Sequence, residues 1–260
     1  MHREGVKFLK LNEQANPNSI RVTKPVNEGR SKTQMSHRHL LLFLGLILIA
    51  LGLFERGWLL VMVWLGCDFM SLGIAHTKGA HRVFGKRPDG SLPLWSWFVF
   101  FPLLIYIAIV WHGIRLLSRE PAQNTVTSDL VIGRRLLPHE IEGEFDNYVD
   151  LTAEFVEPPS ISKSSAYYCF PILDGAAPDP ESLRRAIGRL RPGKTFIHCA
   201  QGHGRTGLFA LAVLLKSGAA KTVEEGLDIL LAARPGVRLN AAQRRCIGRF
   251  ALGPGEKYPQ

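Results

Sequence analysis

One short segment of the sequence, residues 197–207, carries a cysteine and an arginine six positions apart among three glycines. An apolar run precedes it and a helix-forming run follows, so the sequence predicts a strand, a glycine-rich loop and a helix start in that order. In such a loop successive backbone N–H groups point inward, and the following helix adds the positive end of its dipole. The segment is therefore suited to hold a phosphate dianion.

Cys199 and Arg205 bring two kinds of chemistry to this anion site. A thiol at a helix N-terminus beside a cation ionises readily, and its thiolate is a nucleophile at neutral pH. Arg205 presents a planar fork of donors that can bind two phosphate oxygens at once, which a lysine cannot do. Thr206 can donate its hydroxyl to the thiolate. The spacing predicts a nucleophilic cysteine that faces a bound phosphate group.

Six positions of this segment resemble the His-Cys-x5-Arg-Ser/Thr signature of the cysteine-dependent protein tyrosine and dual-specificity phosphatases. They are His198, Cys199, Gly202, Arg205, Thr206 and Gly207. The resemblance covers residues 129–252, about half of the chain. It implies an α/β fold: a compact dual-specificity-phosphatase-like domain with a mainly parallel sheet flanked by helices. It also implies hydrolysis of phosphomonoesters through a phosphocysteine intermediate, with no cofactor and no metal.

The same resemblance assigns roles to the rest of the loop. The phosphate-binding positions it implies are Ala200, Gln201, Gly202, His203, Gly204 and Arg205. His198 is expected to order the loop through hydrogen bonds, and His203 at the outer rim either meets substrate or faces water. An ordinary buried thiol and a rhodanese-type sulfur carrier are the alternatives. The six matched positions disfavour the first, and the longer spacing from Cys199 to Arg205 disfavours the second.

A general acid is expected on a mobile loop that precedes the nucleophile in the chain. Asp174 follows a predicted strand and precedes Gly175, which resembles the general-acid loop of the family. Asp179 fits better as the N-cap of the next helix. Only 25 positions separate Asp174 from Cys199, which suggests a trimmed intervening helix. Gln243 is a candidate for positioning the attacking water, and a helix-surface glutamine is the alternative.

The elements that position these residues are read from periodicity and turn signals. Predicted strands cover residues 130–132, 148–151, 166–172 and 194–198. Predicted helices cover residues 180–190, 205–216, 223–233 and 241–250. Strands that alternate with helices imply a mainly parallel sheet with helices packed on it. The domain is expected to span residues 129–253, after a polar linker at residues 118–128 and before a short tail at residues 254–260.

The N-terminal half has a different composition. A basic tail, residues 1–38, is expected to be disordered. A predicted transmembrane region, residues 39–117, contains apolar segments at 40–54, 57–75 and 94–112. A buried hairpin of a soluble protein is the alternative. Asp68 lies inside this region, where an unpaired carboxylate is costly. It is therefore expected either to have a functional or paired role or to face the interior of the helix bundle. The connection at residues 76–93, with Lys78, Arg82, Lys86 and Arg87, is expected to be a basic juxtamembrane loop.

Charge and cysteine usage limit the partners. The chain has 32 Lys and Arg against 22 Asp and Glu, a formal net charge of +10. Most of the basic excess surrounds the apolar third, which points to a membrane surface and not to nucleic acid. The four cysteines are far apart and form neither a disulfide framework nor a zinc pattern.

The combined pattern predicts a multi-pass integral membrane phosphatase, with the cell membrane as its location. Phosphotyrosine, phosphoserine or phosphothreonine in proteins is the first substrate class, and a membrane-lipid phosphomonoester such as phosphatidylglycerophosphate is the second. A catalytically idle phosphate-binding scaffold is a third hypothesis. Three crossings and the bias of basic residues place catalysis outside the cell. An exposed thiolate is readily oxidised outside the cell, so we place the active site on the reducing cytoplasmic side. The N-terminal tail and the active site can both be cytoplasmic only if the chain crosses the membrane an even number of times.

Overall fold

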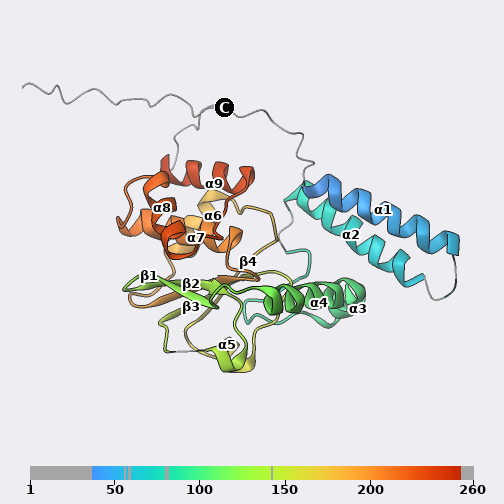
Figure 1. Ribbon diagram of the computed structural model, residues 1–260, viewed down its shortest axis with the longest axis horizontal. Coiled ribbons are helices and arrows are strands. Elements are labelled where there is room, and N and C mark those ends of the chain that lie inside the picture. Colours follow the sequence, from blue (N-terminus) through green and yellow to red (C-terminus); the bar gives the residue numbers. More distant parts are fainter. Residues whose placement is uncertain (1–36, 56, 58–59, 80–81, 142, 253–260) are drawn as a thin grey trace, which may run out of the picture. The chain divides into compact units, whose positions relative to one another are not determined.

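The computed structural model describes residues 37–55, 57, 60–79, 82–141 and 143–252 (Figure 1). The predicted disordered tail lies outside the described residues except for His37 and Arg38, which begin the first helix. The predicted C-terminal tail also lies outside them.

The C-terminal half of the chain, residues 118–252, is built on a five-stranded sheet in the order β1-β2-β5-β3-β4. Its strands are β1 Gln123–Thr127, β2 Leu130–Arg134, β3 Asn147–Thr152, β4 Tyr167–Ile172 and β5 Thr195–Cys199. Only the pair of β1 with β2 is antiparallel, and the pairs of β5 with β2, β5 with β3 and β3 with β4 are parallel. The prediction of a mainly parallel sheet is confirmed.

Helices cover both faces of this sheet (Figure 1). They are α5 Pro159–Ser162, α6 Pro180–Ile187, α7 Gly204–Ser217, α8 Val223–Ala233 and α9 Ala241–Leu252. Alternate residues along β5 serve the two faces: Ile197 belongs to the large core with α6, α7, α8 and α9, whereas Phe196 packs with Ile161 of α5. A strand buried on both faces needs a continuous apolar run, which is why β5 was recognisable in the sequence.

The central position of β5 sets the place of the functional loop. Its neighbours are β2 and β3, so Cys199 lies at the carboxyl end of the middle strand. The next helix, α7, begins at Gly204 and is buried along most of its length. The predicted order of strand, loop and helix is therefore confirmed, and it puts the loop at the sheet edge where ligands bind in open α/β folds.

The predicted linker at residues 118–128 contains a strand, so this part of the prediction is wrong. β1 is polar in sequence, and its residues are half-buried on average because it forms an edge of the sheet. An edge strand has neither a continuous apolar run nor a clean alternation. Its position is determined by pairing with β2, from Gln123 opposite Gly133 to Thr127 opposite Leu130.

Two long apolar helices, α1 His37–Glu55 and α2 Leu60–Lys78, pack closely together. Glycines allow this approach: a Cβ on Gly45 would lie 2.8 Å from the Gly66 carbonyl oxygen, and a Cβ on Gly66 would lie 2.6 Å from that of Gly45. Small residues at contact points are typical of helix pairs in membranes. By length and composition, both helices are able to cross a membrane.

The third predicted span, residues 94–112, is not one helix. It forms α3 Leu94–Val99 and α4 Phe101–Leu117, which meet at Phe100. Pro102 lies in the first turn of α4, where the missing N–H of a proline is tolerated. In one continuous helix over 94–112 it would lie in the interior, where a proline breaks or kinks the helix. The 17 residues of α4 are also fewer than a typical span needs. The prediction of a single membrane helix here is wrong.

The connection between α2 and α3 folds against the C-terminal half. Phe84, Lys86 and Leu92 of this connection are all buried. One apolar cluster includes residues of α1, α2 and α4 and Phe100, which follows α3, together with Ala153 and Leu173 of the C-terminal half. The predicted basic juxtamembrane loop is therefore wrong for Lys86, because its ammonium group lies inside the protein.

Candidate active site

The Cys199 side chain is only 3% exposed at the end of β5. The backbone N–H of Gly202 donates a hydrogen bond to its sulfur at 3.2 Å, so a loop amide already points at the nucleophile. Gly202 has a φ of +76°, and a Cβ there would lie 2.4 Å from the Gly133 carbonyl oxygen. Only glycine fits this turn without displacing the Gly133 backbone.

Arg205 lies in the first turn of α7 and is 2% exposed. Its two terminal nitrogens donate to the two carboxylate oxygens of Glu154 at 2.9 and 2.8 Å. One of them also donates to the Ile172 carbonyl oxygen at 3.0 Å. Burial alone would lower the pKa of Arg205, but the neighbouring carboxylates, Glu154 first, raise it well above its usual value. The guanidinium is thus charged and fixed in orientation.

Glu154 was not predicted. It lies two residues beyond β3, at the same carboxyl edge of the parallel sheet as Cys199. Side chains at that edge converge in α/β folds, so the position of Glu154 just after a predicted strand was the available signal. Its bidentate contact occupies both terminal nitrogens of Arg205, and Nε is the guanidinium donor that has no partner among the described residues.

Asp174 lies within ion-pair distance of the same guanidinium, 3.2 Å from one of its terminal nitrogens. Its side chain is 74% exposed, so it can reach solvent and a bound substrate. The backbone of its loop is held by two residues near α9: Asn240 donates to the Gly175 carbonyl oxygen at 2.8 Å, and Gln243 donates to that of Ala176 at 3.2 Å. The structure brings Asp174 to the loop, as the sequence predicted.

Gln243 is 2% exposed, so the alternative of a helix-surface glutamine is wrong. Its amide lies beside Gly204, where an added Cβ would come within 3.2 Å of the amide oxygen. Gln243 therefore connects the candidate nucleophile loop, residues 200–203 between β5 and α7, with the segment that carries Asp174. Asp179, in contrast, caps α6 by accepting a hydrogen bond from the Ser182 N–H at 3.0 Å. Its predicted capping role is confirmed.

The outer side of the loop is held by Arg234, which the sequence analysis missed. Arg234 is 1% exposed and donates to the carbonyl oxygens of Gly202 and Gln201, each at 3.0 Å. Glu120 accepts from Arg234 at 2.8 Å and pairs with His203 at 2.7 Å. Glu120 belongs to the predicted linker, so that segment helps to shape the site.

The loop is also attached to α4. The indole N–H of Trp111 donates to the Ala200 carbonyl oxygen at 2.8 Å, and Trp111 is 2% exposed. The Arg135 guanidinium lies 5.3 Å from the Trp111 ring centroid, a cation–π distance. A segment predicted to cross the membrane therefore contacts the nucleophile loop directly.

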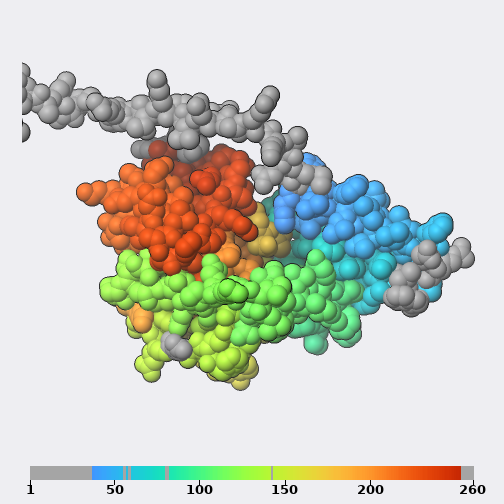
Figure 2. Space-filling model, in the orientation of Figure 1, coloured from blue at the N-terminus to red at the C-terminus, as the bar shows by residue number. Residues whose placement is uncertain are grey.

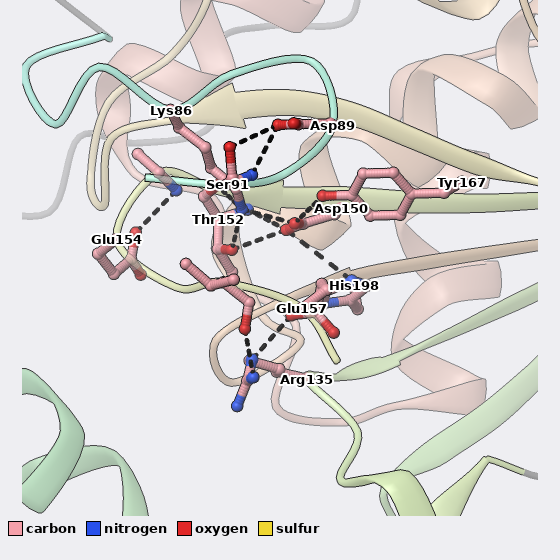
Figure 3. A network of polar contacts seen from close by, with 12 residues as sticks. Lys86, Asp89, Ser91, Arg135, Asp150, Thr152, Glu154, Glu157, Tyr167 and His198 are labelled. Atoms are coloured by element: carbon pink, nitrogen blue, oxygen red, sulfur yellow. Dashed lines mark hydrogen bonds and ion pairs between the residues drawn. The ribbon is translucent and has the colours of Figure 1, made fainter. Parts of the chain in front are cut away.

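Behind the loop lies a buried polar network around Asp150 (Figure 3). Lys86 donates to Asp150 at 2.5 Å and to the Thr152 carbonyl oxygen at 2.8 Å. Tyr167 donates its hydroxyl to Asp150 at 2.7 Å. Burial alone would raise the pKa of Asp150, but the Lys86 ammonium, His198 and these hydrogen bonds lower it. Asp150 is therefore a carboxylate whose charge is balanced chiefly by Lys86.

His198 borders this network and is completely buried. Burial lowers its pKa to about 4 although Asp150 opposes the shift, so the ring is neutral at pH 7. Its Nε2 lies 3.9 Å from Asp150, and neither ring nitrogen has a hydrogen-bond partner among the described residues. Its ring stacks on Phe196 at 5.6 Å between centroids. The His198 ring is therefore held by packing against Phe196. The hydrogen bonds from His198 to the loop that the sequence predicted are not among the described contacts.

Asp150, Glu157 and His198 bring three metal-ligating side chains within 4.8 Å of one another. Each carboxylate already has a cationic side chain as its partner: Lys86 pairs with Asp150, and Arg135 donates to Glu157 at 2.7 Å. Burial and the Asp150 charge raise the pKa of Glu157 to about 7. A divalent ion here would stand beside two fixed positive charges, so these residues do not fit a metal.

Thr206 is buried, and its hydroxyl has no partner among the described residues. The predicted hydrogen bond from Thr206 to Cys199 is therefore absent from the described contacts. The sulfur receives the Gly202 N–H instead.

No protein-family model and no curated protein matches this chain. Among solved structures, Tk-PTP in its active form is 24% identical, with a TM-score of 0.45, over 51% of this chain and 97% of that one. PTPMT1 in complex with PI(5)P is 11% identical, with a TM-score of 0.44, over 50% and 95%. Human DUSP28 is 14% identical, with a TM-score of 0.43, over 51% and 94%.

Proposed function

We propose that the chain is a cysteine-dependent phosphatase that hydrolyses phosphomonoesters through a phosphocysteine intermediate. One observation carries this proposal: Cys199 at the carboxyl end of the central strand and Arg205 in the first turn of α7 flank one loop, whose Gly202 N–H is directed at the sulfur while Glu154 holds the Arg205 guanidinium. This arrangement combines a nucleophile with preorganised donors for a phosphate.

In the proposed reaction the Cys199 thiolate attacks phosphorus in line, and the P–O bond to the leaving group breaks. Arg205 and the loop amides stabilise the charge on the equatorial oxygens. Asp174 protonates the departing oxygen. Water then attacks the phosphocysteine, Asp174 accepts a proton from it, and the thiolate leaves. Gln243 is proposed to position this water from its place beside Gly204, and Thr206 to assist the departing thiolate.

Two substrate classes remain candidates. Phosphorylated proteins are implied by the sequence resemblance. The variable loop residues Ala200, Gln201 and His203 supply no lysine for a polyphosphorylated headgroup, and His203 is paired with Glu120. A phospholipid with a single phosphomonoester, such as phosphatidylglycerophosphate, is favoured by the contact of the loop with an apolar helix. An idle scaffold is disfavoured because nucleophile, arginine and acid lie together.

Vanadate is expected to inhibit the enzyme and EDTA to leave its activity unchanged. The oxyanion matches the thiolate and the arginine fork, and the proposed steps require no metal. Hydrolysis of an aryl phosphate, measured with each reagent, tests the proposal. Loss of activity on chelation that a divalent ion restores would assign the protein to another class of phosphatase.

Asp174→Asn is expected to slow hydrolysis of an alkyl phosphate much more than that of an aryl phosphate with an acidic leaving group. The alkoxide needs a proton to depart, whereas the acidic aryl oxide needs little help. Asp179→Asn is the matched control because it should cost only the α6 cap, about 1 kcal/mol or less of stability. The ratio of kcat values for the two phosphates measures the effect. If Asp179→Asn changed that ratio and Asp174→Asn did not, the assignment would be reversed.

We also propose that α1 and α2 cross the membrane as a hairpin, so that the N-terminal tail and the catalytic half share the cytoplasmic side. With two crossings, Arg56 is the only basic residue in the sequence between the two helices. The bias of basic residues and the need of the thiolate for a reducing compartment then agree.

A membrane-impermeant maleimide applied to intact cells tests this topology in a chain without native cysteines. A cysteine at Glu224, which is exposed on α8, should react only after lysis. A cysteine at Gly57, between α1 and α2, should react without lysis. Labelling at Glu224 in intact cells would place catalysis outside.

A further inference from the structure

Three successive peptide units of the nucleophile loop have their carbonyl oxygens held by side chains from outside the loop. The indole N–H of Trp111 donates to the Ala200 oxygen at 2.8 Å. The Arg234 guanidinium donates to the oxygens of Gln201 and Gly202, each at 3.0 Å. A trans peptide unit is planar, and its C=O and N–H point in opposite directions. A donor that fixes a carbonyl on one side therefore fixes the N–H of the same unit on the other side.

The second of these units shows the result directly. Arg234 holds the Gln201 carbonyl oxygen. The N–H of the same unit belongs to Gly202, and it donates to the Cys199 sulfur at 3.2 Å. A donor behind the loop thus aims a backbone amide at the side where the nucleophile lies.

Trp111 acts on the first unit as Arg234 acts on the second. Its bond to the Ala200 carbonyl directs the Gln201 N–H away from the indole. The backbone N–H of Arg135 also reaches the Ala200 oxygen, but at 3.4 Å, which is beyond about 3.2 Å, the usual limit for such a bond. The indole therefore supplies the shorter contact. A hydrogen bond to a carbonyl also polarises its peptide unit, which makes the N–H of that unit a stronger donor.

The indole ring of Trp111 is held in one orientation by its neighbours. Trp111 is 2% exposed. The Arg135 guanidinium lies 5.3 Å from the indole centroid and is itself fixed, because it donates to Glu157 at 2.7 Å. The Phe155 ring lies 5.5 Å from the indole, measured between centroids. A buried ring with these contacts keeps its N–H directed at one place.

The helix that carries Trp111 is also fixed to the C-terminal half of the chain (Figure 2 shows α4 in green at the molecular surface beside that half). Leu103 and Leu104 of α4 belong to a buried apolar cluster that includes residues of that half. Arg115 of α4 pairs with Glu140, the last residue of a 3-10 turn, η2, at 2.9 Å. The donor to the nucleophile loop is therefore part of a rigid helix that precedes the sheet in the chain.

We propose that Trp111 is a positioning residue of the active site. Its bond to Ala200 holds the Gln201 N–H towards the bound phosphate, so that this amide and that of Gly202 face the same anion. The Gln201 amide then stabilises charge on an equatorial phosphoryl oxygen as the transition state forms. The part of this inference that concerns turnover rests on the proposed phosphatase function, whereas the direction of the amide towards an anion does not.

Two substitutions in the full-length protein separate the hydrogen bond from the packing of the indole. Trp111→Phe keeps an aromatic ring beside Arg135 and removes the donor. Trp111→His loses the six-membered ring of the indole, but its Nε2 takes the place of the indole nitrogen and can donate to Ala200 at about pH 8, where a histidine is neutral. Lost apolar burial predicts that the histidine variant is the less stable of the two. The proposed hydrogen bond predicts that it is the more active.

Turnover of an aryl phosphate and binding of tungstate are measured in detergent micelles. In Trp111→Phe, kcat should fall about tenfold, less than on complete removal of an oxyanion donor, because the amide remains but is no longer aimed. Tungstate affinity should fall about fivefold, as for the loss of one neutral hydrogen bond. Trp111→His should keep both values close to those of the unaltered protein. Trp64→Phe is the matched control, because the Trp64 indole donates to the Val99 carbonyl oxygen at 2.7 Å, outside the loop, and its loss should change neither value.

Other outcomes contradict separate parts of the inference. If Trp111→His lost at least as much turnover and tungstate affinity as Trp111→Phe, the indole would only fill space and the positioning role would be overturned. Equal losses in Trp64→Phe would overturn it as well. If the unaltered protein hydrolysed no phosphomonoester, the proposed function would fail, and the order of the tungstate affinities would still decide whether Trp111 aims the loop. Absence of tungstate binding to the unaltered protein would overturn both.

Discussion

Cys199→Ser is expected to abolish turnover, with a loss in kcat on the order of 10⁴-fold or more, as removal of the nucleophile does in other covalent enzymes. A serine hydroxyl is scarcely ionised at neutral pH and is a much weaker nucleophile than a thiolate. Binding of tungstate, a phosphate analogue that needs no bond to the sulfur, should persist because Glu154 and not Cys199 holds the Arg205 guanidinium. Single-turnover hydrolysis of an aryl phosphate and a tungstate binding titration give the two readouts.

Cys246→Ser is the matched control for this experiment. Cys246 is also buried, and its thiol donates to the Pro178 carbonyl oxygen at 3.2 Å. A serine there can keep this hydrogen bond, so turnover should remain near that of the unaltered protein. Near-normal turnover in Cys199→Ser would rule out the phosphocysteine mechanism.

Lys86→Met is expected to destabilise the fold by about 3–5 kcal/mol, the usual cost of removing one partner from a buried ion pair. Both side chains of the pair are at most 1% exposed, so the Asp150 carboxylate would lose its closest counter-ion without gaining water. Methionine keeps most of the side-chain volume, which separates the loss of charge from the loss of packing. Denaturant unfolding of the protein in detergent micelles measures the change.

The double variant Lys86→Met/Asp150→Asn tests the cause. If the uncompensated carboxylate is responsible, removing its charge should recover much of the lost stability, and the two changes should be strongly non-additive. Lys78→Met, at the exposed last residue of α2, should have little effect. Additive losses would contradict an ion pair that matters for folding.

The local patterns in the sequence predicted the local elements well. The four strands with apolar runs and the four helices that follow turn signals were found within a few residues of their bounds. The nucleophile loop was found because its glycines, cysteine and arginine are neighbours in the chain. β1 was missed because a polar edge strand owes its conformation to its partner β2 and not to its own side chains.

The rest of the site could not be predicted because its contacts join distant positions. Glu154 and Arg205 are 51 residues apart, and Lys86 and Asp150 are 64 apart. A lysine near an apolar segment usually indicates a basic surface loop. No residue close to Lys86 in the sequence indicates that its ammonium group will pair with a distant carboxylate. The break at Phe100 was also missed, although Pro102, near the middle of the predicted span, is a residue that favours the first turn of a new helix.

The Lys86–Asp150 pair has a consequence for the order of events during synthesis. Chains fold from the N-terminus as they are made, so the α1–α2 hairpin and Lys86 leave the ribosome before any catalytic strand exists. The lysine then remains solvated until Asp150, 64 positions later, becomes available. The C-terminal half therefore completes its core on a lysine already placed next to the hairpin, and a nascent chain that began after residue 86 would have a buried carboxylate with no ammonium to neutralise it. Completion of the sheet and its buried network is in this way bound to prior placement of the N-terminal helices.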